Sequence, residues 1–359
     1  MKKRVAIVGA TGIAGQQAVV ALQGHPWFEI AVLAASERSA GKTYADALRD
    51  EKTGARRWWC TEEPDDGVLR MPVHDAASLD LRGIDFVLSC VESDVARELE
   101  PRFARTTPVI SNASAFRYEE DVPILVPGVN LEHARLLEVQ RKRRGWDGFI
   151  TPLPNCTTTG LVITLKPLFD RFGLERVVMT SMQGISGAGR SPGVLGLDIV
   201  DNIIPFIAGE EEKVARETGK ILGRLGEGGI APAVFPVSAT CTRAAVLEGH
   251  TEAVVVGLGS RANLAEVTEC WREFGRDFVN LGLPSAPKKM ITVHEDPFRP
   301  QPRLDRDADG GMTTHVGRIR EDSAFPNGWR YILLSHNTKM GAAKGAVLVA
   351  EYLAMEKYI

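Results

Sequence analysis

The sequence predicts an α/β protein whose N-terminal part forms a parallel sheet. Three apolar runs carry this prediction: "RVAIV" at 4–8, "FEIAVLAAS" at 28–36 and "IDFVLSCV" at 84–91. A glycine-rich turn and an apolar helical pattern follow the first run, which is typical of a strand–turn–helix unit. The spacing of the runs suits successive βα units, and "PVISNASAF" at 108–116 adds a further strand.

Beyond about residue 155 the strand-like segments become longer and alternate with glycine-rich connections. They are "RVVMTSMQGIS" at 176–186, "AVVVGLG" at 253–259 and "RYILLSHN" at 330–337. This pattern predicts a second, mixed α/β domain. The final stretch, "NTKMGAAKGAVLVAEYLAM" at 337–355, predicts a helix with small residues on one side, suited to close packing.

Length and composition limit the possible functions. The chain has 359 residues, 44% hydrophobic and 25% charged, so it can bury the cores of two domains. Its net charge of -3 gives no electrostatic reason to expect nucleic acid or a membrane surface as partner. The five cysteines include no CxxC pair and predict neither disulfides nor a metal site. Glycine interrupts the apolar N-terminal stretch too early for a signal peptide, so we expect a cytoplasmic protein with reduced thiols.

A glycine triplet, Gly9, Gly12 and Gly15, lies between the first strand and its helix. Glycines let a backbone turn tightly and approach a pyrophosphate, which the helix N-terminus then binds. A bare triplet also fits an ordinary βα turn. The strand before it and the helix after it favour a dinucleotide site, with Thr11 and Ile13 as further cofactor contacts.

The end of the second strand indicates which dinucleotide binds. An NAD site usually has an acid there for the ribose 2′-hydroxyl, but this strand continues as "SERSAGK". Ser36, Arg38 and Ser39 offer hydroxyls and a guanidinium suited to a 2′-phosphate, with Lys42 nearby. The sequence therefore favours NADP. Glu37 keeps NAD open, and a solvated polar turn is the remaining alternative.

Cys156 lies in "TPLPNCTTTG", between a proline-rich turn and the apolar start of a predicted helix. Asn155 before it and three threonines after it are the setting of a helix N-terminus. Unpaired backbone N–H groups and the helix dipole stabilise a thiolate at such a position. Cys156 is therefore the candidate nucleophile.

Arg243 and His250 follow in "CTRAAVLEGHTEAVVV". Seven positions apart in one strand would put them on opposite faces. A turn or bulge at Glu248–Gly249 must therefore re-aim one of them if both face a single site. Taken alone, His250 fits a hydrogen-bonded structural histidine as well.

Other candidates lie in loops and on a helix. Gln183 leads a glycine loop, "QGISGAGR", whose amides could orient an acyl group and bind phosphate. Glu210 and Lys213 are three residues apart and therefore neighbours on a helical face. Arg117 follows the strand at 108–116. Each of these, taken singly, also fits a surface charge or a turn.

These residues together resemble those of aspartate-semialdehyde dehydrogenases, of the branch common in archaea and fungi. The motifs "GATGIAG", "SNASAFR", "PNCTTTG", "MQGISGAGR", "GEEEK", "TRAAVLEGHTE" and "HNTKMGAAKGA" occur in the family's order over essentially the whole chain. The resemblance implies a Rossmann-type NADP-binding domain (1–155 plus 337–359) with an inserted α/β, mixed-sheet catalytic and dimerisation domain (156–336). It also implies a homodimer or homotetramer.

The resemblance further implies a role for each candidate residue. Cys156 would form the acyl-enzyme, Gln183 would orient it, and His250 would act as the acid–base. Contacts to the substrate, including its carboxylate, amino and phosphate groups, would come from Arg243, Glu210, Lys213, Arg117 and Asn112. Ser186, Gly187 and Asn337 would join the residues of the glycine loop and the second strand in binding NADP.

The reaction implied is NADPH-dependent conversion of L-4-aspartyl phosphate to L-aspartate 4-semialdehyde and inorganic phosphate, a step in lysine, threonine and methionine biosynthesis. A thioester on Cys156 suits hydride transfer because its carbonyl is more electrophilic than a carboxylate. Two departures from the family pattern, Gly128 in "VPGVN" and the strand "RAAVLEGH", leave a shifted substrate open. The alternatives are a malonyl-CoA reductase, an N-acetyl-glutamyl-phosphate reductase and a non-catalytic NADP-binding sensor.

Overall fold

The computed structural model describes residues 1–189, 194 and 196–359, and these form two compact units. The N-terminal unit comprises Met1–Pro123, Ala134–Leu153 and Ala342–Ile359, and the second unit comprises Ile124–His133 and Pro154–Gly341. Across the described residues, no helix combines the length and apolar character needed to cross a lipid bilayer.

The N-terminal unit contains a six-stranded sheet in the order β3-β2-β1-β4-β5-β6, with every pair parallel. This is the strand order of a Rossmann-type fold, in which the order reverses between β1 and β4. The parallel sheet predicted from the sequence is confirmed. The strands are β1 (Lys3–Val8), β2 (Phe28–Ala35), β3 (Val73–Asp75), β4 (Phe86–Ser89), β5 (Val109–Ser111) and β6 (Ile150–Pro152).

Helices cover both faces of this sheet. Because β2 and β5 lie on opposite sides of the β1–β4 pair, right-handed crossovers place α1 (Ile13–Leu22) and α4 (Ser93–Ala104) on opposite faces. The C-terminal helix α12 (Ala343–Met355) packs against α1. The remaining helices of this unit are α2 (Tyr44–Ala47), α3 (Asp66–Leu69) and α5 (Leu136–Arg144).

The last helix begins at Ala343, later than the predicted start at Asn337. Residues 337–342 form turns, and Ala342 has a non-helical backbone (φ -153°, ψ -114°). The Gly341 N–H donates to the carbonyl of His336 at 3.0 Å. A Cβ on Gly341 would lie 2.8 Å from the carbonyl oxygen of Asn337, so the chain doubles back there too tightly for a helix.

The two units differ from the expected division at three short segments, 124–133, 154–155 and 337–341, which cluster with the second unit. The segment 124–133 clusters with the second unit because its residues contact residues farther along that unit. His133 Nε2 lies 3.2 Å from the carbonyl oxygen of Gly223, and a Cβ on Gly128 would meet Met290 and Phe278 at 3.1 and 3.3 Å. Nothing in the sequence indicated that the segment 124–133 would cluster with the second unit.

The second unit contains a seven-stranded sheet in the order β13-β14-β15-β12-β7-β11-β8. The β13–β14 and β7–β11 pairs are parallel and the others antiparallel, so the predicted mixed sheet is confirmed. The strands are β7 (Leu174–Gln183), β8 (Ile203–Ile204), β11 (Val237–Ala244), β12 (His250–Leu258), β13 (Ile291–Val293), β14 (Thr314–Asp322) and β15 (Gly328–Ser335). A separate hairpin pairs β9 (Arg224–Leu225) with β10 (Ile230–Ala231).

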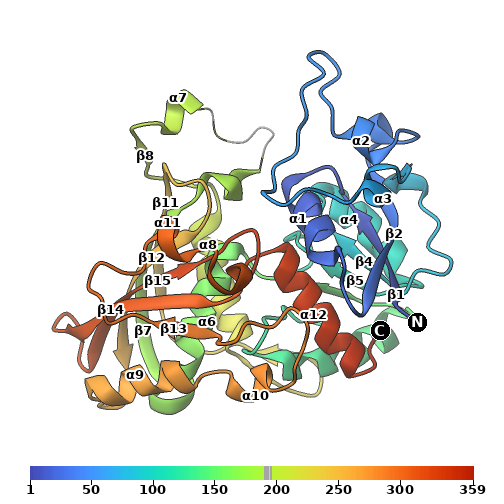
Figure 1. Ribbon diagram of the computed structural model, residues 1–359. Coiled ribbons are helices and arrows are strands. Elements are labelled where there is room, and N and C mark those ends of the chain that lie inside the picture. Colours follow the sequence, from blue (N-terminus) through green and yellow to red (C-terminus); the bar gives the residue numbers. More distant parts are fainter. Residues whose placement is uncertain (190–193, 195) are drawn as a thin grey trace. The chain divides into compact units, whose positions relative to one another are not determined.

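Two helices, α6 (Cys156–Phe172) and α9 (Leu264–Glu273), pack against each other and against this sheet (Figure 1). Trp271 Nε1 donates to the carbonyl of Thr164 at 2.9 Å and ties the two helices together. Val178 and Thr180, which alternate with buried residues along β7, are exposed. The other helices are α7 (Gly196–Ile199), α8 (Glu210–Ile221), α10 (Arg276–Val279) and α11 (Pro302–Asp305).

Candidate active site

Cys156 is the first residue of α6, as the sequence predicts. Asn155 caps the helix, because its side-chain oxygen accepts from the backbone N–H groups of Thr157 at 2.8 Å and Thr158 at 3.4 Å. The half-buried Cys156 Sγ lies 3.1 Å from His250 Nε2. The helix N-terminus and the imidazole therefore act on the same sulfur atom.

His250 is fully buried, and its other ring nitrogen is also bonded. Nδ1 accepts a hydrogen bond from the backbone N–H of Gly184 at 3.1 Å. Burial lowers the pKa of His250 to about 3, with a smaller contribution from the nearby Arg243 cation. The ring is therefore neutral at physiological pH, and its single proton lies on Nε2, facing the sulfur. In this state the imidazole donates a hydrogen bond to a Cys156 thiolate.

Arg243, Gln183 and His250 lie side by side on one face of the sheet. Arg243 is opposite Gln183 in the β11–β7 pair, and the β12–β7 register places His250 beside Gln183. The predicted turn between Arg243 and His250 is confirmed, and Gly249 within it has φ +94°. A Cβ on Gly187 would lie 2.9 Å from Arg243 Nη1 and 3.3 Å from His250 Nε2, so both side chains converge on that glycine.

The guanidinium of Arg243 is buried, and among the described residues no carboxylate forms an ion pair with it. Its Nη1 donates to the carbonyl of Gly184 at 2.9 Å. Burial lowers the pKa of Arg243 below its ordinary value, while the neighbouring Cys156 and Glu210 act in the opposite direction. A buried cation beside the thiol can receive a carboxylate of a substrate.

Glu210 is the first residue of α8 and is buried. Its Oε1 accepts from Asn155 Nδ2 at 2.7 Å, and its Oε2 lies 3.7 Å from Lys213 Nζ. The predicted pairing of Glu210 and Lys213 on one helical face is confirmed. Glu210 is thus linked to the residue next to Cys156, and its carboxylate can receive an ammonium group.

The loop after β7 supplies the remaining predicted residues of this unit. Gln183 is buried, and its Nε2 donates to Ser181 Oγ at 3.2 Å. Asn337 Nδ2 donates to Ser186 Oγ at 2.8 Å, while its Oδ1 accepts from the Gly249 N–H at 2.8 Å. Arg190, the last residue of the predicted glycine loop, lies outside the described residues.

The glycine loop of the N-terminal unit has the shape of a phosphate cradle. Gly9 has φ +86°, and a Cβ there would lie 2.5 Å from the carbonyl oxygen of Cys90. A Cβ on Gly15 would lie 2.2 Å from the carbonyl oxygen of Gly9. Only glycine permits this approach of turn, strand and helix, with Gly12 as the N-cap of α1. These residues fit a dinucleotide pyrophosphate.

The end of β2 presents the residues predicted to read the 2′-phosphate. Ser36 and Arg38 are exposed, whereas Ser39 is buried. Lys42 Nζ forms an ion pair with Glu51 at 2.8 Å and is therefore already neutralised. Arg117, a predicted substrate residue of this unit, is held by backbone carbonyls. Its guanidinium donates to the carbonyls of Leu153 and Asn112, at 2.8 and 3.1 Å.

Comparison with known proteins identifies the family to which the chain belongs. The family models "Semialdehyde dehydrogenase, NAD binding domain" and "Semialdehyde dehydrogenase, dimerisation domain" match residues 4–137 and 165–340. The chain belongs to the semialdehyde dehydrogenase family. It is 46% identical to the aspartate-semialdehyde dehydrogenase of Methanothermobacter thermautotrophicus over 97% of this chain and 98% of that protein. The enzyme of Saccharomyces cerevisiae is 42% identical, over 100% of this chain and 99% of that protein.

Solved structures agree with this placement in the semialdehyde dehydrogenases. Aspartate semialdehyde dehydrogenase with NADP from Candida albicans has a TM-score of 0.90 and 40% identity, over 99% of this chain and 100% of that chain. Aspartate semialdehyde dehydrogenase II complexed with ASA from Vibrio cholerae has a TM-score of 0.77 and 27% identity, over 99% of each chain.

Sequence reasoning missed several residues of this semialdehyde dehydrogenase's site. Asn155 joins α6 to α8, since its backbone N–H donates to Glu217 Oε2 at 2.6 Å in addition to its side-chain bonds to α6 and Glu210. Its position before a predicted helix indicated the helix N-terminus but not the bonds to Glu210 and Glu217, which lie more than 50 residues away along the chain. Glu252 lies two residues after His250, fully buried, and burial raises its pKa well above the ordinary value. Strand alternation alone could have placed Glu252 on the catalytic face.

One further cluster of this dehydrogenase has the composition of a metal site. Ligand atoms of His294, Asp305 and His315 lie within 4.8 Å of one another. However, the guanidinium of Arg299 donates to both carboxylate oxygens of Asp305 and brings a positive charge to the cluster. We therefore assign no metal to these residues.

The thiols of this dehydrogenase should differ sharply in reactivity. Burial raises the pKa of Cys241 to about 11 and the pKa values of Cys90 and Cys270 to about 12, so these thiols stay protonated at neutral pH. We expect iodoacetamide at pH 7.5 to alkylate Cys156 first. Peptide mass spectrometry over a time course measures the order, and equal rates at all five cysteines would contradict the assignment of Cys156 as the activated thiol.

Proposed function

We propose that the chain catalyses NADPH-dependent conversion of L-4-aspartyl phosphate to L-aspartate 4-semialdehyde and phosphate, in the biosynthesis of lysine, threonine and methionine. The observation that carries this proposal is the group formed by the Cys156 thiol, the His250 N–H and the Arg243 guanidinium, which has no ion pair with a carboxylate of the described residues. This group offers a nucleophile, a hydrogen-bond donor to it and a receptor for a carboxylate. The family membership of the chain supports the same activity.

The reaction begins with attack of the Cys156 thiolate on the acyl carbon. A C–S bond forms, the C–O bond to phosphate breaks, and phosphate leaves with the bonding electrons. NADPH, when bound, supplies a hydride to the carbon of the resulting thioester. The thiohemiacetal oxyanion then collapses, breaking the C–S bond and releasing the aldehyde. The Nε2–H of His250 stabilises the departing thiolate, and in the reverse direction it donates to the thiolate that attacks the aldehyde.

The remaining residues bind the charged groups of the substrate and the cofactor. Arg243 binds the α-carboxylate, because a guanidinium can hold it through two hydrogen bonds. Glu210 binds the amino group, Gln183 orients the acyl group, Arg117 and Lys213 bind phosphate, and Asn112 is a further contact to the substrate. Asn337, Ser186 and Gly187 contact the nicotinamide end of the cofactor, while Gly9, Thr11, Gly12 and Ile13 hold its pyrophosphate.

The preference for NADP rests on the end of β2. Arg38→Ala should weaken NADP binding by about tenfold or more but leave NAD binding nearly unchanged, because only NADP carries the 2′-phosphate. Titration of the intrinsic fluorescence with each cofactor measures both dissociation constants. Equal losses for the two cofactors would place Arg38 outside the 2′-phosphate site.

We also propose that the protein is a cytoplasmic homodimer or homotetramer. The name of the matched C-terminal family model, a dimerisation domain, supports association of two copies. Four apolar side chains in the segment 197–206 are exposed, which supports a contact between subunits there. They are Leu197, Val200, Ile203 and Phe206, with relative exposures of 98%, 69%, 60% and 65%. Analytical ultracentrifugation distinguishes the two assemblies.

The test of the activity is NADPH formation from L-aspartate 4-semialdehyde, phosphate and NADP, beside a control without phosphate. Phosphate-dependent turnover is expected. If the aldehyde and phosphate give no NADPH while NADP still binds, the proposed substrate is wrong. Malonyl-CoA and N-acetyl-glutamyl phosphate, tested in the reductive direction, then distinguish the two related reductases, and inactivity with all three would indicate an NADP-binding sensor.

A further inference from the structure

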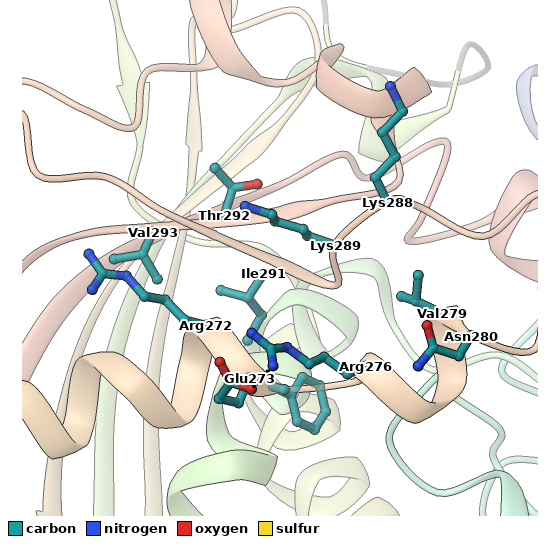
Figure 2. Close-up of a pocket in the computed structure, with 11 residues that line it drawn as sticks. Arg272, Glu273, Arg276, Val279, Asn280, Lys288, Lys289, Ile291, Thr292 and Val293 are labelled. Carbon is teal, nitrogen blue, oxygen red and sulfur yellow. Dashed lines mark ion pairs between the residues drawn. The ribbon is translucent and has the colours of Figure 1, made fainter.

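A cavity of about 450 Å³ lies in the second unit, away from the residues of the candidate active site. Its walls are the end of α9, the helix α10, the strand β13 and the preceding Lys288 and Lys289 (Figure 2). None of its lining residues belongs to the catalytic, substrate or cofactor residues described above. The volume is in the range of pockets that hold small-molecule ligands.

The charged side chains of this cavity are mainly cations. Four of them line it, and Glu273 is the single carboxylate in the lining. Arg276 forms an ion pair with Glu273, and Arg272 pairs at 2.9 Å with Glu295, outside the lining. The cations are Arg272, Arg276, Lys288 and Lys289.

The two lysines are not neutralised by protein groups. Both are exposed, and within the described ranges neither ammonium group has an ion pair. Figure 2 shows Lys289 extending over the same hollow as Arg272 and Arg276, whereas Lys288 points away from them. Three cations from separate segments thus face one space, and one net positive charge, that of Lys289, remains after the Arg276–Glu273 and Arg272–Glu295 pairs are counted. Such an arrangement attracts an anion whose oxygens can accept hydrogen bonds from several of these side chains, as those of a phosphate group can.

The uncharged part of the lining indicates what else the ligand contains. Phe274, Val279, Ile291 and Val293 give apolar wall, and Asn280 and Thr292 add an amide and a hydroxyl. Ligand sites commonly combine such apolar walls with a few polar groups that fix orientation. Inorganic phosphate alone would leave most of this volume empty.

We propose that this cavity is a second ligand site, which binds a nucleoside diphosphate or a phosphorylated small molecule of similar size and charge. Arg276, Arg272 and Lys289 hold the phosphate groups, and the ring system of the ligand packs on the apolar wall. The site is separate from the proposed reaction and does not depend on it. It gives the enzyme a place at which a phosphorylated metabolite can bind without occupying the catalytic residues.

The probe for this proposal is ADP, titrated by calorimetry at low salt into enzyme saturated with NADP, so that the cofactor site is already filled. ADP should bind, and Lys289→Ala and Arg276→Gln should each weaken it about tenfold, the value of one charge-assisted contact. Arg261→Ala is the matched control, because Arg261 is exposed in the same unit but does not line the cavity. Its affinity for ADP should equal that of the wild type.

Three results would overturn the proposal: no binding of ADP, unchanged binding in both cavity variants, or equally tight binding of adenosine, which lacks phosphate. If Arg261→Ala weakens ADP binding as much as the cavity variants do, the binding depends on the general surface charge and not on the cavity, which would also overturn the proposal. Thermal unfolding of each variant confirms that it folds. Dehydrogenase turnover, measured without ADP, should be unchanged in Lys289→Ala, so a failure of this site is distinguishable from a failure of the proposed reaction.

Discussion

Replacing Cys156 with serine is expected to lower kcat by at least about a thousandfold while NADP still binds. A serine hydroxyl would need a base to become a nucleophile, and His250 cannot supply one in its observed state. Its Nδ1 accepts from Gly184, and its Nε2 already carries the proton. The steady-state rate of NADPH formation and a separate titration with NADP measure the two effects.

The matched control is Cys270→Ser. Cys270 Sγ donates to the carbonyl of Val267 at 3.1 Å, a bond that a serine hydroxyl can keep, and it lies in α9. This variant should turn over at the wild-type rate. Substantial residual activity in Cys156→Ser, or an equal loss in Cys270→Ser, would show that Cys156 does not form the acyl-enzyme.

Arg243→Lys is expected to raise KM for L-aspartate 4-semialdehyde by about tenfold or more. A lysine can keep a bond to the Gly184 carbonyl, but it cannot hold a carboxylate through two parallel hydrogen bonds. Initial rates at saturating NADP and phosphate, with the aldehyde varied, measure this effect. KM for NADP should stay unchanged, since no cofactor role is assigned to Arg243.

Arg261→Lys, the same exchange at an exposed position outside the site, should leave both KM values at their wild-type levels. If KM for the aldehyde stays constant in Arg243→Lys, the α-carboxylate is bound by another residue.

The fold was predictable to the extent that its signals are local. The apolar runs at 4–8, 28–36 and 84–91 became β1, β2 and β4, because a buried parallel strand needs an apolar side chain on both faces. The start of α12 was predicted too early. The alanine-rich stretch from 337 has helical propensity, but side-chain bonds of Asn337 to Ser186 and Gly249 hold it in a turn. Contacts over such sequence distances override local propensity.

The features of the candidate site that depend on neighbouring residues were also predictable, whereas those that depend on distant residues were not. The placement of Cys156 at a helix start and the turn before His250 were predictable, since each depends on neighbouring residues. The tautomer of His250 was not, because it depends on the Gly184 N–H, 66 residues away. Nor could the sequence show that Arg243 lacks a carboxylate partner among the described residues. That property belongs to the packed sheet, and it distinguishes a binding arginine from a structural one.

Asn155 has a consequence for attempts to redesign substrate preference. One side chain caps the nucleophile's helix through its oxygen and fixes Glu210 through its nitrogen. Exchanging Glu210 for an apolar residue, to admit acids without an amino group, would therefore also release the cap that orients Cys156. Glu210→Gln retains an oxygen for Asn155 and removes only the charge. An engineering route that begins from this variant can alter selectivity without disturbing the reactive sulfur.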